Sequence, residues 1–440
     1  MSSEHTQASR PCIIIPGIGQ SKVIEIDRNG EKVRNLWPFD ADMAALIKRV
    51  AAPAARMMLL RRDCGFSSAL ESAVRGLLEP LSCNADSSRK VSAQVVRYPY
   101  PVSKCSADDK RYIYKMVPLN ELADSIGEDK LYFFAYDIFG RAEENARLLR
   151  EFIALVKEQT ASKKVNLIPV SMGATVAELY LDLYGGDCDV SRVVGVVPAY
   201  NGSDIVSDFM SGNVRTDNCS DLLEMLLSRK EAEKIGRIFA KMPAKVADAA
   251  VRKLIRGAAE TVIVNCSSMW GLIPSDKYSA LRDKYLVNSE HDELRATTDL
   301  HWRVRKNLKG LVEREQARSV EFYNICGCGK RLIPISASSD ITSDTIVPTY
   351  SASMGAHCAA PGKTLHDRRN SPKDFLSPRG DINASSAAAP DRTWFFYGME
   401  HEQAAENRAL LSLVKIIITS EEPIDVFTLP DYPQFMEYKK

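Results

Sequence analysis

Short, continuous runs of apolar residues recur along the chain and are separated by longer amphipathic segments. Several runs are rich in β-branched residues and do not alternate with polar ones, which is typical of strands buried on both faces of a parallel sheet. We therefore predict strands of one mostly parallel sheet. The runs cover residues 12–16, 93–98, 131–136, 165–170, 193–198, 320–326 and 393–397.

The segments between these runs have the periodicity of helices. In residues 143–158 the apolar side chains fall on one helical face, and residues 176–183 follow the i, i+3, i+4, i+7 spacing. Strands that alternate with helices indicate an α/β fold, in which right-handed crossovers connect parallel strands. We expect a central sheet that is flanked by helices.

Two helical segments interrupt the alternation. The first, at about residues 40–90, contains apolar stretches edged with basic residues. The second, residues 204–316, is charged, with helices predicted at 221–239 and 244–258. We expect it to form a cap over the substrate side of the sheet; the alternative is a helical layer that only covers the sheet. The predicted organisation is a disordered N-terminus (1–10), a first part of the core that contains the first insertion (11–203), the cap (204–316) and a second part of the core (317–440).

Composition narrows the possible partners and location. The 440 residues include 45% hydrophobic ones, as expected for a globular protein with a sizeable core. The balance of 58 basic and 57 acidic residues gives no overall attraction to nucleic acid, so we expect no nucleic-acid partner. The polar first ten residues do not resemble a secretory signal, and no run reaches the roughly 18 apolar residues of a spanning helix. The expected location is the cytoplasm, with the ten cysteines as reduced thiols.

Residues 165–175 are the most informative segment for chemistry. An apolar run ends at Ser171, which small residues flank, and a helical pattern begins at once. An α/β-hydrolase carries its nucleophile at such a strand-to-helix corner. The usual G-x-S-x-G pattern is altered at one position, because Pro169 replaces the first glycine. A serine hydroxyl also needs a histidine as base and a carboxylate to orient that histidine.

In α/β-hydrolases the acid and then the histidine follow the serine along the chain. His401 has the most suitable context, since it follows the predicted strand 393–397 and precedes a predicted helix at 402–418. The carboxyl ends of strands are where α/β sites assemble. The acid is expected in the preceding loop, which contains Asp340 and Asp344. We favour Asp344 because residues 345–348 continue directly from it and would fix the loop, with Asp340 as the alternative.

The negative oxygen of an acyl-transfer intermediate needs two backbone N–H donors. One should be Met172, the residue after the nucleophile. The other should come from residues 16–20, a glycine-rich turn directly after the first predicted strand. Such a turn can also bind phosphate, but neither a G-x-G-x-x-G nor a Walker pattern follows it.

Taken together and in order, eight segments resemble the lecithin:cholesterol acyltransferase-like family of α/β-hydrolases, a branch of lipases and acyltransferases. They are residues 13–19 (its V-P-G opening), 36–38 (its early tryptophan), 135–137 with Arg141 (its Y-D-W-R segment), 171–173 (its nucleophile elbow), 197–203 (its A-P-x-x-G-S stretch), 268–274 (its W-x-L-P cap segment), 344–352 (its D-G-T-V-P-x-x-S acid loop) and His401.

The resemblance implies an α/β-hydrolase fold with a helical cap insertion. It implies a triad of Ser171, Asp344 and His401, and oxyanion donors from the amides of Ile18 and Met172. It also implies a supporting salt bridge between Asp137 and Arg141.

The predicted function is therefore that of a serine hydrolase or acyltransferase. Its substrate would be an acyl ester, lipid-like in character, and the mechanism needs no metal and no organic cofactor. The alternative is a catalytically silent α/β-hydrolase-like binding protein, for which Pro169 is the main support. Residues 56–62 suggest peripheral membrane contact, although a surface helix edge has the same charge pattern. The sequence does not determine the oligomeric state.

Overall fold

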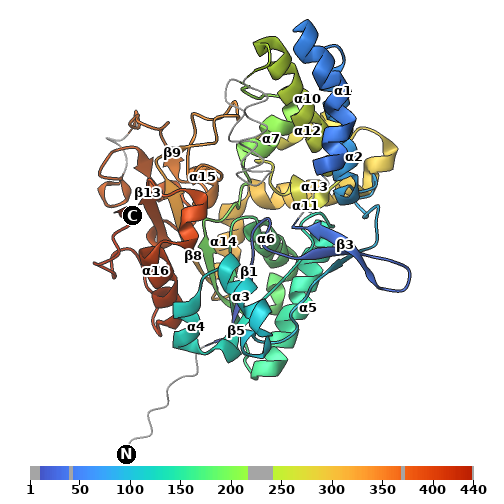
Figure 1. The fold of residues 1–440 in the computed structure, drawn as a ribbon. Coiled ribbons are helices and arrows are strands. Elements are labelled where there is room, and N and C mark those ends of the chain that lie inside the picture. The colour runs from blue at the N-terminus through green and yellow to red at the C-terminus, as the bar shows by residue number, and fades with distance from the viewer. Residues whose placement is uncertain (1–9, 39–42, 217–240, 368–371, 439–440) are drawn as a thin grey trace, which may run out of the picture.

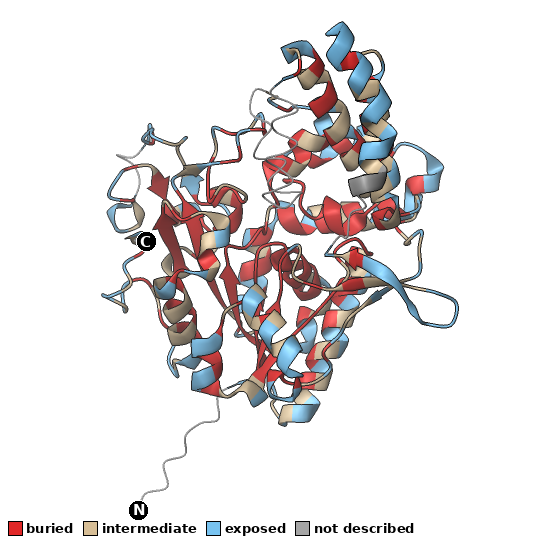
Figure 2. Ribbon diagram, in the orientation of Figure 1, coloured by how far each residue is buried: buried red, intermediate tan, exposed pale blue. Residues whose placement is uncertain are grey.

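A seven-stranded parallel sheet lies at the centre of the computed structural model, which describes residues 10–38, 43–216, 241–367 and 372–438 (Figure 1). The strand order is β14-β13-β8-β7-β6-β1-β5, and every neighbouring pair is parallel. The strands are β1 (Cys12–Ile15), β5 (Leu131–Phe133), β6 (Val165–Pro169), β7 (Val190–Val196), β8 (Glu321–Cys328), β13 (Thr393–Tyr397) and β14 (Phe435–Glu437). Apart from β14 and the first residue of β8, these strands are buried throughout, which explains their non-alternating apolar sequences (Figure 2).

Six of the seven predicted strands lie in this sheet, and one prediction is wrong in its placement. The run at 93–98 forms β4 (Ala93–Val95), which pairs antiparallel with β2 (Val23–Ile26). Together with β3 (Lys32–Trp37) they make a separate three-stranded sheet. The physical reason is exposure, because β4 is only partly buried whereas the central strands are covered on both faces. The edge strand β14 was not predicted, since it has three residues and is partly exposed.

Helices cover both faces of the central sheet. Along β1, Ile13 and Ile15 pack into one core with α5 (Ala142–Thr160) and α6 (Gly173–Tyr184). The side chains of Cys12 and Ile14 point the other way, into a core with α3 (Ala107–Met116), α4 (Asn120–Ile126) and α16 (Arg408–Thr419). The predicted α/β-hydrolase architecture, a parallel sheet flanked by helices, is confirmed.

The two insertions pack against each other. The first provides α1 (Met43–Leu60) and α2 (Phe66–Leu78), and the second provides α7 (Asp204–Ser211) and α10 (Ala244–Val262). These helices share an apolar cluster, to which Leu332, Ile333 and Ile335 also contribute, and form one lobe beside the sheet (Figure 1). We call this unit the helical lobe. It contains the predicted helix at 244–258, whereas the predicted helix at 221–239 and residues 1–9 of the predicted disordered terminus lie outside the described residues.

The later part of the second insertion lies on the core. Helix α13 (Asp292–Lys306) packs on α6, and α14 (Leu308–Gln316) packs on α6 and β8. The backbone N–H of Ser203, in the loop that follows β7, donates to the carbonyl of Leu272 at 2.8 Å. This hydrogen bond joins the second insertion to the loop at the carboxyl end of β7.

Two further expectations concern the helices and the cysteines. None of the helices in the described residues has both the length and the hydropathy that a bilayer-spanning helix requires. The described cysteines are free thiols, and six of the nine are buried.

Candidate active site

Ser171 lies at a sharp corner between β6 and α6. Its φ angle is 50°, in the left-handed region that a non-glycine residue enters only where surrounding contacts enforce it. The corner is tight: a Cβ on Gly173 would lie 2.1 Å from the carbonyl oxygen of Ile15, and one on Gly17 would lie 2.9 Å from the Cβ of Ser171. Glycine at both positions allows β1, β6 and α6 to meet at the serine.

The corner forms with Pro169 in place of the usual glycine. Pro169 is the last residue of β6 and pairs in register with Ile15. The two amides that follow are both bonded, Val170 to the carbonyl of Ile15 at 2.9 Å and Ser171 to the carbonyl of Val196 at 3.1 Å. The sheet hydrogen bonding continues directly after the proline, so the missing N–H does not prevent the elbow.

The structure brings Ser171, His401 and Asp344 together although they lie far apart in the sequence. Nε2 of His401 lies 2.9 Å from Oγ of Ser171, and Nδ1 lies 2.7 Å from Oδ2 of Asp344. Ser171, His401 and Asp344 follow β6, β13 and β8, so the site lies at the carboxyl ends of the central strands, as expected for this fold. The predicted helix at 402–418 is divided into a 3-10 helix, η10 (His401–Ala405), and α16, which the side chain of Asn407 caps.

Asp344 is fully buried and held by backbone donors. Its Oδ1 accepts the N–H groups of Ile346 at 3.0 Å and Val347 at 2.7 Å, while Oδ2 faces His401. The alternative acid, Asp340, has a side chain that is 65% exposed and pairs with Arg331 instead. The geometry therefore places Asp344, and not Asp340, behind the histidine.

The electrostatics of His401 suit a proton acceptor. Burial by itself lowers the pKa of His401, but the charge of Asp344 and its hydrogen bond raise it by more. The pKa therefore lies above the usual value of 6.5. Ser171 is only 8% exposed, so this hydrogen-bonded chain lies in a largely desolvated position, where such interactions are strong.

The two expected oxyanion donors are free to bind a ligand atom. Among the backbone hydrogen bonds of the described residues, none uses the N–H of Ile18 or Met172. Met172 directly follows the serine, and Ile18 lies in the turn whose Gly17 contacts the serine. Ile18 is 45% exposed, which leaves this side of the corner accessible.

A residue that the sequence analysis missed holds the turn at 16–20. Gln20 accepts the N–H of Gly17 at 2.5 Å through Oε1 and donates to the carbonyl of Met116 at 2.8 Å through Nε2. From the other side, the hydroxyl of Tyr136 donates to the carbonyl of Pro16 at 2.9 Å. No local pattern marks these roles, because Met116 and Tyr136 come from distant segments.

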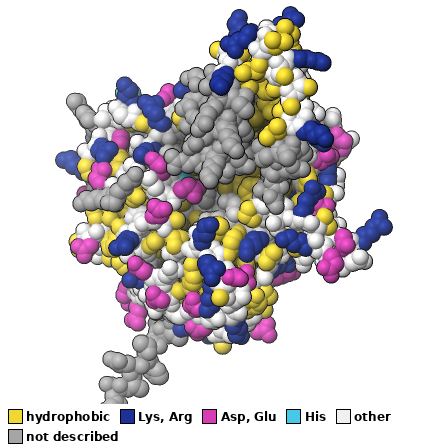
Figure 3. Space-filling model, viewed as in Figure 1, with side chains coloured by type: hydrophobic (Ala, Val, Ile, Leu, Met, Phe, Trp, Pro, Cys, Tyr) yellow, Lys and Arg dark blue, Asp and Glu magenta, His cyan; other side chains and the backbone are white. Residues whose placement is uncertain are grey.

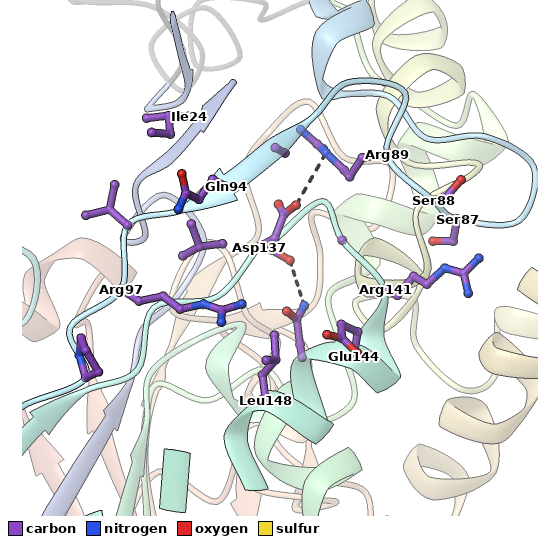
Figure 4. A pocket seen from close by; sticks show the side chains of 16 residues that line it. Ile24, Ser87, Ser88, Arg89, Gln94, Arg97, Asp137, Arg141, Glu144 and Leu148 are labelled. Carbon is purple, nitrogen blue, oxygen red and sulfur yellow. Dashed lines mark hydrogen bonds and ion pairs between the residues drawn. The ribbon is translucent and has the colours of Figure 1, made fainter. Parts of the chain in front are cut away.

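The predicted salt bridge between Asp137 and Arg141 is wrong. Asp137 faces Arg89, with 3.6 Å between Oδ2 and Nε (Figure 4). Arg141 instead pairs with Asp86 at 3.0 Å and Glu293 at 2.5 Å. The reason is the turn between them, which directs the aspartate toward the first insertion, whereas the arginine precedes α5 and reaches both insertions.

Comparisons with known proteins add little to this geometry. No family model matches the chain, and no curated protein matches it. A chain in a solved structure described as "The crystal structure of Tle4-Tli4 complex" is 12% identical, with a TM-score of 0.40 over 93% of this chain and 98% of that chain. Similarity at this level carries no conclusion about the chemistry of the site.

Proposed function

We propose that this protein is a serine hydrolase or acyltransferase that cleaves acyl esters through an acyl-enzyme intermediate. The observation that carries the proposal is the continuous hydrogen-bonded chain from Ser171 through His401 to Asp344, with distances of 2.9 and 2.7 Å. The positive φ of Ser171 at the end of β6 supports it, because that strained corner presents the hydroxyl to the histidine.

In this mechanism Ser171 attacks the ester carbonyl while His401 takes the proton from Oγ. Asp344 keeps the imidazole in the tautomer that accepts at Nε2 and stabilises the imidazolium. The N–H groups of Ile18 and Met172 bind the negative oxygen, and the loss of one such donor typically raises the barrier by about 2.7–4 kcal/mol. His401 then donates the proton to the leaving alcohol, and water or a second alcohol releases the acyl group.

We further propose a lipid-like substrate. The resemblance to the lecithin:cholesterol acyltransferase-like family points to it, and so does the surface of the helical lobe. Helix α1 exposes Ile47, Met58, Leu59 and Leu60 close to basic side chains (Figure 3). An apolar surface edged with positive charge is suited to contact with an anionic lipid surface. The cytoplasmic location and the choice between water and an alcohol as acceptor remain predictions.

The proposal is tested with a fluorophosphonate probe followed by mapping of the adduct. We expect labelling of Ser171 that is absent in Ser171→Ala and weak in His401→Ala. Ser125→Ala serves as the control, because the hydroxyl of Ser125 is exposed and bonds only to its own helix. A folded, monodisperse protein that is not labelled at Ser171 would instead be the silent binding protein.

A further inference from the structure

Two buried thiols from distant parts of the chain meet where both insertions rest on the core. Cys83 lies in the first insertion and Cys266 in the second, and both are at most 1% exposed. Sγ of Cys83 lies 3.1 Å from the carbonyl oxygen of Phe139. Sγ of Cys266 lies 3.8 and 3.9 Å from the carbonyl oxygens of Ile138 and Gly140. Both sulfur atoms therefore contact the same turn of the core.

The backbone around the two cysteines is also held together. The side-chain amide of Asn265 donates to the carbonyl of Cys83 at 3.3 Å. The N–H of Ser267 donates to the hydroxyl of Ser87 at 2.9 Å, and the two serine hydroxyls are 3.1 Å apart. A disulfide requires the two backbones to be close and correctly oriented, and here contacts on both sides of the cysteines bring them together.

The two thiols differ in acidity. The neighbouring thiol of Cys266 and the charge of Arg89 together outweigh burial and lower the pKa of Cys83. Burial raises the pKa of Cys266 well above its usual value. Since the thiolate is the reactive form, the lowered pKa makes Cys83 the thiol that attacks first.

We propose that Cys83 and Cys266 are a redox modification site, at which a peroxide closes a disulfide between the two insertions. The sulfur of Cys83 attacks one oxygen of hydrogen peroxide, the O–O bond breaks, and a sulfenic acid forms while the other oxygen leaves as water. The sulfur of Cys266 then attacks the sulfenic sulfur, and the second oxygen leaves as water. Two thiols are oxidised to one disulfide, and one peroxide is reduced to two waters.

A cavity lies beside the turn that both sulfur atoms contact. It has a volume of about 800 Å³, and its lining includes Ser87, Arg89, Asp137 and Gly140 (Figure 4). Gly140 is also the residue whose carbonyl contacts Cys266. A peroxide in this cavity is thus adjacent to the turn on which both sulfur atoms lie.

The disulfide would join the two insertions covalently at their contact with the core. It would close a loop from residue 83 to residue 266, and long loops are those whose closure most restricts the unfolded chain. We therefore expect oxidation to raise the melting temperature. This inference does not depend on the proposed hydrolase activity, because none of its steps involves Ser171 or His401.

The test uses the full chain, reduced with dithiothreitol and then titrated with hydrogen peroxide. Peptide mapping without reduction should show a linked peptide that contains Cys83 and Cys266. The melting temperature should rise by several degrees and return after reduction. Cys105→Ser, which removes another buried thiol, should keep the linked peptide, whereas Cys83→Ser and Cys266→Ser should lose it.

Two outcomes would overturn the proposal. In the first, both cysteines of the peroxide-treated, unsubstituted protein are still alkylated by iodoacetamide after denaturation. In the second, either cysteine is linked to a different partner. Both are read from the unsubstituted protein, so a folding defect in a variant does not affect the result. Fluorophosphonate labelling of the reduced protein reports separately on the proposed activity.

Discussion

Two buried pairs of a histidine and a carboxylate in this protein have similar geometry but opposite electrostatics. His401 lies 2.7 Å from Asp344, and His301 lies 2.9 Å from Glu178. The pKa of His401 is raised, because the charge and hydrogen bond of Asp344 outweigh burial. The pKa of His301 is lowered well below 6.5, first by burial and then by the charge of Arg305. The distance between the partners therefore does not decide what the histidine can do.

The difference lies in what supports the carboxylate. Asp344 accepts two backbone N–H groups in addition to the histidine. Glu178 is fully buried, and its Oε2 has no hydrogen-bond partner among the described residues. Burial raises the pKa of Glu178 well above its usual value, despite the opposing charge of Arg305. A carboxylate with donors can polarise a histidine as a base, whereas one without them favours a neutral pair.

The second pair connects the core to the later part of the second insertion. Glu178 is on α6, the helix that begins just after Ser171, and His301 is on α13. We interpret it as a structural contact that holds α13 against α6. The comparison can be tested by substitutions that should affect activity at one pair and stability at the other.

The largest effect is expected for Ser171→Ala. Removal of the proposed nucleophile should lower turnover of a short-chain p-nitrophenyl ester by up to about 10⁶-fold, since triad residues act as a unit. The melting temperature should change little, because only one oxygen atom is lost. Turnover that is retained in Ser171→Ala would exclude this serine as the nucleophile.

A smaller loss is expected for Asp344→Asn. The amide favours the wrong tautomer of His401, which in a well-studied triad costs about 10⁴-fold in kcat. The matched substitution Glu178→Gln should leave ester turnover within about tenfold of the unsubstituted protein, and Asp340→Asn should do the same. Steady-state kinetics of the three variants decide the assignment, which is wrong if Asp340→Asn alone is inactive.

The free energy of unfolding should depend more on Glu178 than on the proposed active-site residues. Glu178→Ala removes the buried carboxyl group that bonds to His301 and opens a cavity between α6 and α13, which together should cost about 3 kcal/mol. Glu178→Gln keeps the shape and should cost about 1 kcal/mol. Urea unfolding of both variants measures the free energies. Equal losses for the two variants would contradict a neutral, shape-dependent pair.

The smallest effect concerns pH. The pKa of His301 is lower in the folded protein than in the unfolded chain, so the unfolded chain binds the proton more readily. The free energy of unfolding therefore falls as the pH drops below about 6.5. His401 has the opposite sign: its contribution is present below about pH 6.5 and is lost as the pH rises through its raised pKa.

Urea unfolding at pH 5.5, 7 and 8.5 measures how the free energy of unfolding changes with pH. His301→Gln should reduce the loss of stability toward acid, and His401→Gln should reduce the loss toward alkali. The value of kcat/KM should also increase with pH, in a transition whose pKa lies above 6.5. A kinetic pKa below 6.5 would contradict the polarised His401.

Much of the core and of the candidate site could be predicted from local sequence. Continuous apolar runs predicted six central strands. A strand that is buried on both faces has an apolar sequence whichever strand it pairs with, so the run can be recognised locally. Ser171 and His401 were found because each follows such a run directly. The order of the acid before the histidine left Asp340 and Asp344, and the continuation at residues 345–348 favoured Asp344. The structure places Asp344 2.7 Å from the imidazole.

Other features were decided only by the tertiary structure. The two insertions gave no sign of sharing a core, and Arg141 pairs with Asp86 and Glu293 rather than with nearby Asp137. The turn at residues 138–140 that both Cys83 and Cys266 contact, and the hydrogen bond from Gln20 to Met116, also join distant segments.

The sequence by itself thus determined which segments are buried and where a nucleophile could stand, because burial and backbone corners depend on neighbouring residues. The tertiary structure decided which charges meet, and with that which histidine is polarised. His301 and His401 are the same residue type beside the same kind of group. Only the donors and charges around each, brought in by other parts of the chain, make one a candidate base and the other a structural contact.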